Sequence, residues 1–257
     1  MNGGNAGAAK TEALFACEGV VKTYAGEPVV AGISLELSKG GFISLLGPSG
    51  VGKTTLFNVL AGVDTPDEGK IFLAGEDITG VSGRVSYMLQ KDLLLEYRTV
   101  LDNVILPLLI RGEKKREARE YGAAFFPHFG LAGYEKKYPR QLSGGMRQRA
   151  ALLRTCMMRN PVILLDEPFS ALDAITRRQM QEWYRDIAQE MSLSTIFITH
   201  DVEEALVLSD RVYILTGRPG RISRRLDVLP PRPRSHDFPV SAEFSVQKRI
   251  ILEAIGL

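Results

Sequence analysis

The sequence predicts an α/β protein with a parallel core sheet, an antiparallel β subdomain and an inserted α-helical subdomain. One set of continuous apolar runs is typical of strands buried on both faces of a parallel sheet. These runs occupy 42–46, 162–165 and 195–198. Apolar and polar residues alternate over 14–24 and 28–37, as they do in antiparallel strands. A long stretch, 100–139, has neither pattern and is expected to be helical.

From the N-terminus, residues 1–12 are small and polar, and we expect them to form a flexible leader. The two alternating strands follow, and the buried strand 42–46 then meets a glycine-rich loop. A helix that includes 56–60 is expected after the loop. Short apolar runs bounded by Gly and Asp predict two further strands at 69–73 and 85–89.

The helical stretch has an apolar first part, 100–110, and a charged second part, 113–120, which is expected to be a solvated helix face. Another helix is expected to begin at Ser143 and to run to Asn160, because Pro161 stops it. These two helical regions stand between strands on either side.

The C-terminal part begins with an apolar run at 212–215, which predicts a strand, and a turn at 216–221. The segment 218–234 is rich in Pro and Arg. We expect a solvated crossing segment there, with contact to anionic lipid as the alternative. An amphipathic helix is expected to follow.

Composition argues against two functional classes. The 257 residues carry 32 basic and 30 acidic side chains, so the net charge of +2 gives no general argument for nucleic-acid binding. The apolar stretch 101–110 contains Pro107 and is too short to span a bilayer, so we expect a soluble chain. Cys17 and Cys156 lie in unrelated segments without metal-ligand spacing, which predicts buried, reduced thiols.

The glycine-rich loop carries a complete G-x-x-x-x-G-K-[ST] motif between a strand and a helix, which predicts a P-loop NTPase core. Its backbone N–H groups and the helix dipole would hold a triphosphate. Lys53 is predicted to reach the outer phosphates and Thr54 to bind Mg²⁺. A glycine-rich turn before an ordinary helix is the alternative, but it does not need the Lys-Thr pair. The nucleotide-binding residues predicted here are Gly47, Pro48, Ser49, Gly50, Val51, Gly52, Lys53, Thr54 and Thr55.

Two acids, Asp166 and Glu167, follow directly on the apolar run 162–165. A parallel sheet presents such carboxylates at the carboxyl ends of its strands, so Asp166 is predicted to bind Mg²⁺ beside the phosphate loop. Glu167 is predicted to accept a proton from an attacking water. The alternative is an acidic pair that faces solvent, which the presence of the phosphate loop disfavours.

The sequence Leu-Ser-Gly-Gly-Met-Arg-Gln-Arg at 142–149 opens the second predicted helix. Ser143, Gly144 and Gly145 would expose backbone N–H groups at its N-terminus, giving a second anion-binding helix end. Together with the phosphate loop and the acidic pair, this motif resembles the signature of the ATP-binding cassette family. The resemblance covers about 14–220, and the motifs follow one another in the family's order and spacing.

The resemblance implies hydrolysis of ATP with Mg²⁺ by a pair of cassettes. In the family, the signature of one subunit closes over the ATP held by the other. The ATPase domain would occupy 13–220, with a helical subdomain at about 98–160, and 221–257 would form a C-terminal extension.

Further residues match family positions one by one. Tyr24 lies where an aromatic ring stacks on adenine, Gln90 where a glutamine touches Mg²⁺ and the attacking water, and His200 where the switch histidine approaches the γ-phosphate. The alternatives are a tyrosine packed at a strand end, a surface amide and a capping polar residue. Residues 170–173 resemble the D-loop. Met146 stands where the signature has Gln, and we expect altered contacts rather than lost activity.

The kind of cassette follows from the motif count and spacing. One phosphate loop and one signature, 89 residues apart counted from Lys53 to Leu142, leave no room for a long coiled coil. This disfavours the alternative, a soluble cassette ATPase that acts on DNA or the ribosome. The chain instead resembles the ATPase subunit of a bacterial importer. Its turn at 216–222 resembles that of the nitrate, sulfonate and taurine branch, whose relatives also carry thiamine-pyrimidine precursors, so the cargo stays open.

The resemblance also implies partners and a location. We expect a second cassette subunit, in a homodimer, and transmembrane permease subunits, with a periplasmic or surface solute-binding protein engaged indirectly and no nucleic acid. The chain would lie peripherally on the cytoplasmic face of the bacterial inner membrane. A permease helix would enter a groove formed by 91–98 and 100–109. The apolar residues 93–95 suit that contact, with core packing as the alternative.

Overall fold

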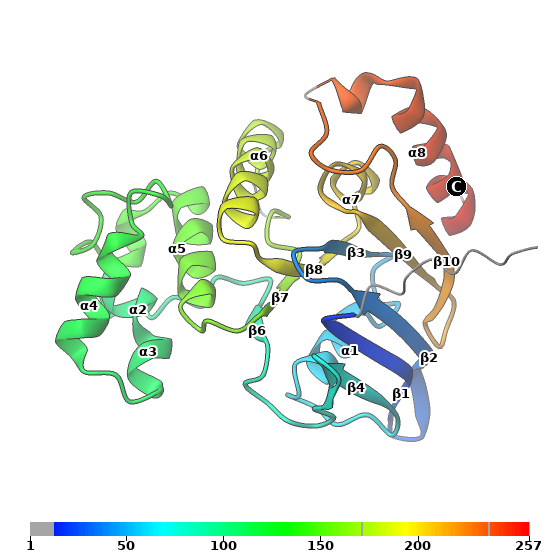
Figure 1. Ribbon diagram of the computed structural model, residues 1–257, viewed down its shortest axis with the longest axis horizontal. Helices are drawn as coiled ribbons and strands as arrows, with labels where there is room; N and C mark the ends of the chain where they lie inside the picture. Colours follow the sequence, from blue (N-terminus) through cyan, green and yellow to red (C-terminus); the bar gives the residue numbers. More distant parts are fainter. Residues whose placement is uncertain (1–12, 171, 236, 257) are drawn as a thin grey trace, which may run out of the picture.

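Two β-sheets and a group of helices make up the molecule (Figure 1). The computed structural model describes residues 13–170, 172–235 and 237–256. The leader expected at 1–12 lies outside these residues. Within them, the predicted α/β class with one parallel and one antiparallel sheet is confirmed.

The larger sheet has six strands in the order β10-β9-β3-β8-β7-β6. All neighbours are parallel except β10, which runs antiparallel to β9. All residues of β3, β7 and β8 are buried, which explains their continuous apolar runs. The strands of this sheet are β3 (Phe42–Leu46), β6 (Ser86–Met88), β7 (Val162–Asp166), β8 (Ser194–Thr199), β9 (Arg211–Thr216) and β10 (Arg221–Asp227).

The smaller sheet is antiparallel, with the order β2-β1-β4-β5. Buried and exposed residues alternate along β2, as the sequence pattern predicted. Helix α1 (Lys53–Leu60) packs between the two sheets. Its Leu56 and Phe57 belong to a buried hydrophobic cluster that also contains side chains from both sheets. The strands are β1 (Phe15–Tyr24), β2 (Glu27–Leu37), β4 (Glu68–Leu73) and the two-residue β5 (Glu76–Asp77), which the sequence did not predict.

A helical group lies beside β6, away from the antiparallel sheet (Figure 1). The prediction that its last helix runs to Asn160 is wrong, because α5 ends at Cys156. Arg159 adopts a left-handed backbone with φ of 53°, and Pro161 disfavours helical geometry at Asn160. The elements of this group are α2 (Val100–Val104), α3 (Leu106–Ile110), α4 (Lys115–Ala124), the 3₁₀ turn η1 (Pro139–Gln141) and α5 (Gly144–Cys156).

Two helices that the sequence analysis did not predict, α6 (Ala174–Glu190) and α7 (Val202–Leu208), flank β8 in the chain. An aspartate caps each N-terminus: Asp173 accepts backbone N–H groups of α6, and Asp201 accepts those of α7. A 3₁₀ turn, η2 (Phe238–Val240), and the expected C-terminal helix, α8 (Ala242–Ile255), complete the chain. Over the described ranges, no helix has both the length and the apolar character needed to cross a bilayer.

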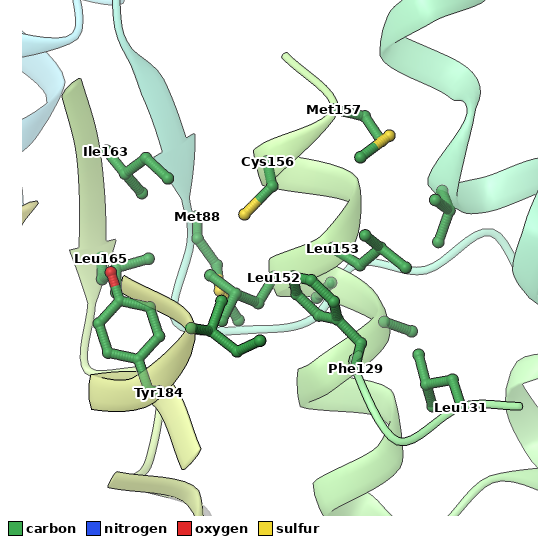
Figure 2. Close-up of a cluster of buried hydrophobic side chains, with 14 of the residues drawn as sticks. Met88, Phe129, Leu131, Leu152, Leu153, Cys156, Met157, Ile163, Leu165 and Tyr184 are labelled. Atoms are coloured by element: carbon green, nitrogen blue, oxygen red, sulfur yellow. The ribbon is translucent and has the colours of Figure 1, made fainter. Parts of the chain in front are cut away.

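Figure 2 shows the core where the signature helix α5 meets the large sheet and α6. Leu152 and Cys156 of α5 belong to the same buried cluster as Met88 of β6 and Tyr184 of α6. Burial raises the pKa of the Cys156 thiol to about 12. Cys17 is also buried with its pKa raised to about 12, so the prediction of two buried free thiols is confirmed.

The Arg-rich segment is not solvated throughout, which corrects the expectation from sequence. Arg234 is buried and donates hydrogen bonds to the carbonyl oxygens of Ser209, at 2.8 Å, and of Leu206 and Val228, both at 3.2 Å. Burial lowers the pKa of its guanidinium to about 10. Arg232 pairs with Asp210 at 2.7 Å. These two cations bind the C-terminal segment to the end of α7 and the start of β9, which leaves them unavailable to lipid.

Candidate active site

The phosphate loop joins β3 to α1 at the carboxyl edge of the large sheet. Gly52 is the N-cap of α1, with φ of 101°, and no side chain caps this helix. A Cβ atom on Gly52 would stand 2.6 Å from Cγ1 of Val30, and one on Gly47 would stand 2.4 Å from the carbonyl oxygen of Leu215. Only glycine fits these two positions, because the loop packs directly on β2 and β9. The uncapped N–H groups of α1 form a cradle for an anion.

Lys53 lies over this loop and is only 6% exposed. Its Nζ donates hydrogen bonds to the carbonyl oxygens of Gly47, at 2.7 Å, and Pro48, at 3.0 Å. Burial lowers the pKa of the ammonium group, while the charges of Glu167 and Asp166 raise it. The cation is thus held within reach of the cradle by groups that a phosphate would outcompete.

Thr54 and Asp166 are adjacent, as the sequence predicted for a magnesium site. The Thr54 hydroxyl donates to Oδ2 of Asp166 at 3.0 Å, which links the start of α1 to the end of β7. Burial raises the pKa of the Asp166 carboxyl, and the hydrogen bond from Thr54 opposes that rise. A hydroxyl beside a carboxylate is a set of hard oxygen ligands that suits Mg²⁺, and a bound cation would offset the cost of burying the carboxylate. The donor set therefore fits the ion.

Glu167 brings three of the predicted residues together. Its Oε1 lies 3.2 Å from Nδ1 of His200, and its Oε2 accepts a hydrogen bond from Nε2 of Gln90 at 3.3 Å. The backbone of Glu167 is left-handed, with φ of 44°, and its N–H donates to the carbonyl of Ile198 at 3.1 Å. Ser170 fixes the same turn, since its hydroxyl donates to the Glu167 carbonyl at 2.9 Å. The strained turn directs the Glu167 carboxylate toward the loop after β6 and the end of β8.

The signature turn is not joined to this group. Ser143 caps α5, and its Oγ accepts the N–H of Met146 at 3.3 Å. A Cβ on Gly145 would lie 3.4 Å from the side chain of Thr176, so the turn packs near the start of α6. Across the described part of the chain, no hydrogen bond connects Ser143, Gly144 or Gly145 with the phosphate loop.

Comparison with known proteins decides the family. The family model described as "ABC transporter" matches residues 30–170, a span that includes the phosphate loop, the signature and the acidic pair. The chain belongs to the ABC transporter family.

Several of its relatives are named as ATP-binding proteins of ABC importers. An aliphatic sulfonates import ATP-binding protein of Rhodococcus jostii is 42% identical over 237 residues, which are 92% of this chain and 91% of that protein. A formylaminopyrimidine import ATP-binding protein of Halalkalibacterium halodurans is 43% identical over 192 residues, 75% of each protein. The predicted likeness to the sulfonate branch of ABC importers is thereby confirmed.

A solved ABC structure shares the fold. It is the dimeric post-hydrolysis state of an ATP-binding cassette bound to ADP and Pi, and it aligns with a TM-score of 0.73 at 26% identity, over 83% of this chain and 98% of that one. The predicted cassette architecture is confirmed. The chain is an ABC ATPase, whose transport-coupled reaction converts ATP and water to ADP and phosphate.

Tyr24 of this cassette lies at the end of β1 with 44% of its surface exposed. Its hydroxyl donates to Oδ2 of Asp64 at 2.5 Å, and Lys22 Nζ donates to Oδ1 of Asp64 at 2.8 Å. The hydrogen bond to Asp64 raises the pKa of Tyr24. Sequence reasoning missed Asp64 and Lys22, because their contact joins residues 42 positions apart and no local motif marks it.

The loop after β6 is bound to the signature helix, which sequence reasoning also missed. Arg154 of α5 donates to the carbonyl oxygens of Asp92, at 2.5 Å, and Leu93, at 2.8 Å. Arg147 Nε lies 3.2 Å from Oδ2 of Asp92. The signal in the sequence is the spacing of 7 between the two arginines, which is about two helical turns and puts both on one face of α5. Met146, the departure from the family signature, packs partly buried against the helical core.

Proposed function

We propose that this chain is the ATP-hydrolysing subunit of a bacterial ABC importer, in which two cassettes close on ATP to drive a separate membrane permease. One observation carries the catalytic part: the Glu167 carboxylate is held between Gln90 and His200, beside the pair formed by Thr54 and Asp166. Four chain segments thus place acids, an amide and an imidazole next to one phosphate cradle. That is the constellation required for attack of water on a γ-phosphate.

Binding of the nucleotide is assigned to the loop and to one aromatic ring. The backbone N–H groups within 47–55, where Pro48 has none, and the ammonium of Lys53 would hold the phosphates. Tyr24 would stack on adenine. Thr54, Asp166 and Gln90 would hold Mg²⁺, which supplies positive charge to the phosphate oxygens. The hydroxyl of Tyr24 donates a hydrogen bond to Asp64, and this bond fixes the orientation of the exposed tyrosine ring.

Glu167 is the proposed general base, and Gln90 and His200 are its neighbours in the reaction. The carboxylate accepts a proton from the attacking water, which Gln90 orients through its amide. His200 holds the second carboxylate oxygen of Glu167 and faces the γ-phosphate. Because the backbone at Glu167 is left-handed, the neighbouring carboxylates of Asp166 and Glu167 point at different groups. One can therefore bind Mg²⁺ while the other acts as the base.

A second copy of this chain would complete each site. The N-terminus of α5 exposes the N–H groups of Ser143, Gly144 and Gly145, which can bind an anion. Among the described residues, these groups make no hydrogen bond to the phosphate loop of their own chain. We assign it to the ATP held by the partner cassette. The dimeric state of the solved relative supports this assembly.

The permease contact is assigned to the loop after β6, at 91–98, together with 100–109. Leu94 is buried in the core, whereas Leu93 and Leu95 are 52% and 43% exposed and Tyr97 is 96% exposed. Apolar surface of this kind suits a helix of a membrane partner. The chain would thus lie peripherally on the cytoplasmic face of the inner membrane and would engage a solute-binding protein only through the permease.

The domain limits and the cargo are also part of the proposal. An ATPase domain at 13–220 would contain the helical subdomain at 98–160, and 221–257 would be an extension that packs on α7 and β9. The proposed cargo is an anion of the nitrate, sulfonate or taurine class, or a small organic precursor. The import proteins for sulfonates and formylaminopyrimidine among the relatives support this range.

The decisive experiment is Glu167→Gln. We expect kcat for ATP hydrolysis to fall by ~10²- to 10⁴-fold, because the amide keeps the size of the side chain but accepts no proton. Affinity for ATP should stay unchanged, since Lys53 and the loop are intact, and gel filtration with ATP and Mg²⁺ should show a trapped dimer. Glu190→Gln, an exposed acid at the far end of α6, is the control. Near wild-type turnover in Glu167→Gln would remove this residue from the base role.

A further inference from the structure

A buried carboxylate that has no role in the proposed chemistry lies behind the His200 turn. Glu204 is in the first turn of α7 and is only 6% exposed. Burial raises the pKa of its carboxyl, and a hydrogen bond from Thr199 opposes the rise. A buried acid costs free energy unless its oxygens are bonded, so its partners show what it holds in place.

One carboxylate oxygen of Glu204 is linked by hydrogen bonds to the residues on both sides of His200. The Thr199 hydroxyl donates to Oε2 of Glu204 at 2.6 Å, and the same hydroxyl accepts the N–H of Asp201 at 2.9 Å. Asp201 Oδ1 in turn accepts the N–H of Glu204 at 3.1 Å. These three contacts join Thr199, Asp201 and Glu204 in a closed ring beside the histidine. The imidazole points out of this ring to Glu167, 3.2 Å away.

Helix α6 supports the other oxygen. Gln181 Nε2 donates to Oε1 of Glu204 at 2.9 Å, and Arg177 Nε lies 3.9 Å from the same atom. Nη1 of Arg177 also lies 3.8 Å from Oδ2 of Asp201. The carboxylate is therefore fixed between the turn that carries His200 and a helix of 17 residues.

We propose that Glu204 is a positioning residue for ATP hydrolysis: it holds the residues before and after His200 so that the imidazole stays against Glu167. The inference rests on the proposed function, because it takes the catalytic assignments of His200 and Glu167 from there. Glu204 touches no substrate in this scheme. Its effect on rate comes from geometry, since a displacement of about 1 Å in a catalytic group costs up to ~10²-fold.

The kinetic test uses Glu204→Ala and the conservative Glu204→Gln. We expect Glu204→Ala to lower kcat by about 10- to 100-fold while the Kd for ATP changes by less than about twofold, because only the His200 turn is loosened. Glu204→Gln keeps an oxygen that accepts from Thr199, so kcat should recover to within about fivefold of wild type. Glu203→Ala is the matched control, since Glu203 is exposed on the same turn and pairs with Lys248.

A double-mutant cycle tests the connection through Thr199. Thr199→Val removes the hydroxyl that joins Glu204 to the N–H of Asp201 and changes little else in volume. It should reproduce most of the loss of kcat seen in Glu204→Ala. The double variant should lose no more than about twofold beyond Glu204→Ala alone, because both changes break one network. Additive losses would contradict the ring described above.

A spectroscopic readout separates positioning from general destabilisation. The chain has three histidines, so the imidazole ¹³C–¹H signals can be assigned with His200→Gln. Glu204→Ala should shift the His200 signals and leave those of His128, which pairs with Glu190, in place. A melting curve taken in parallel identifies any variant that does not fold, and Thr199→Val then carries the test.

The outcomes distinguish this inference from the proposed function. Full turnover in Glu167→Gln would refute the catalytic assignment, while the His200 signals would still report whether Glu204 positions the turn. If Glu167→Gln is inactive but Glu204→Ala keeps kcat within about twofold of wild type, or leaves the His200 signals unmoved, the positioning role alone is overturned.

Discussion

Lys53 makes its hydrogen bonds with carbonyl oxygens of its own loop, and its pKa is lowered by burial. An ammonium in that position has exchanged water for two neutral acceptors. A triphosphate offers it charged oxygens instead, so the attraction between opposite charges adds to each hydrogen bond. The residue therefore connects the shape of the loop to its affinity for nucleotide.

We expect Lys53→Ala to raise the Kd for ATP by about 10- to 100-fold, since one charge-assisted contact is worth about 1.5–3 kcal/mol. A titration with a fluorescent ATP analogue measures this change. Lys39→Ala, at an exposed lysine in the turn before β3, is the control and should bind as wild type does. An unchanged Kd in Lys53→Ala would contradict the assignment of the loop.

The sequence was sufficient for residues whose chemistry is marked by a local motif. Thr54 and Asp166 were predicted to meet, and they lie 3.0 Å apart although 112 positions separate them. Glu204 was not predicted, because nothing in its sequence context distinguishes a buried acid from the exposed Glu203 beside it. Whether a carboxylate turns inward depends on Gln181 and Thr199, which only the folded chain brings near.

At the scale of elements, Arg234 completes the end of α7. Its guanidinium donates to the carbonyl oxygens of Leu206 and Ser209 and, across the segment, to those of Pro230 and Val228. Carbonyl groups at a helix end have no partner within the helix, so a buried end needs donors from elsewhere. The side chain of Arg234 thus supplies hydrogen-bond donors both to carbonyl oxygens at the end of α7 and to those in the segment after β10.

Arg234→Ala is expected to lower the free energy of unfolding by about 2–4 kcal/mol, because several buried carbonyl oxygens would lose their donor. Thermal or urea unfolding measures the change. Arg224→Ala, an exposed position on β10, should cost less than about 0.5 kcal/mol. Equal stability of the two variants would show that water replaces the guanidinium.

Most strands were predicted from the sequence, whereas α6 and α7 were not. The buried strands are marked by unbroken apolar runs. In α6 only Met180, Tyr184, Ile187 and Ala188 are buried, so the helical period is spread over a long polar segment. The N-cap aspartates Asp173 and Asp201 mark both helix starts, but they lie in or beside the segments that resemble the D-loop and the His200 motif.

At the scale of the whole molecule, the proposed dimer can be tested by ATPase measurements on variants, without a structure of the dimer. We expect Ser143→Arg to bind ATP normally but to lose hydrolysis, since the added cation would block the approach of the γ-phosphate to the α5 terminus of the partner cassette. A homodimer of Lys53→Ala should also be inactive, because neither of its sites binds nucleotide well.

Mixing the two inactive variants should restore activity. In a mixed dimer, the site that uses Lys53 of the Ser143→Arg subunit takes its signature from the other subunit, so both motifs are intact there. Equal mixing gives about a quarter of the wild-type rate, if half of the dimers are mixed and each has one working site. The steady-state ATPase rate measures this. Full activity of the Ser143→Arg homodimer would refute the exchange of signatures between subunits.

The place of β3 in the large sheet has a consequence for biosynthesis. Ile43 pairs with Ile196 on one side and with Arg211 on the other, and Gly47 packs against Leu215. A ribosome therefore releases the phosphate loop long before it releases the strands that enclose it. Pairings so distant along the chain form slowly, and the apolar β3 stays exposed meanwhile. The growing chain therefore gains its nucleotide cradle only after the residues up to Leu215 have been synthesised.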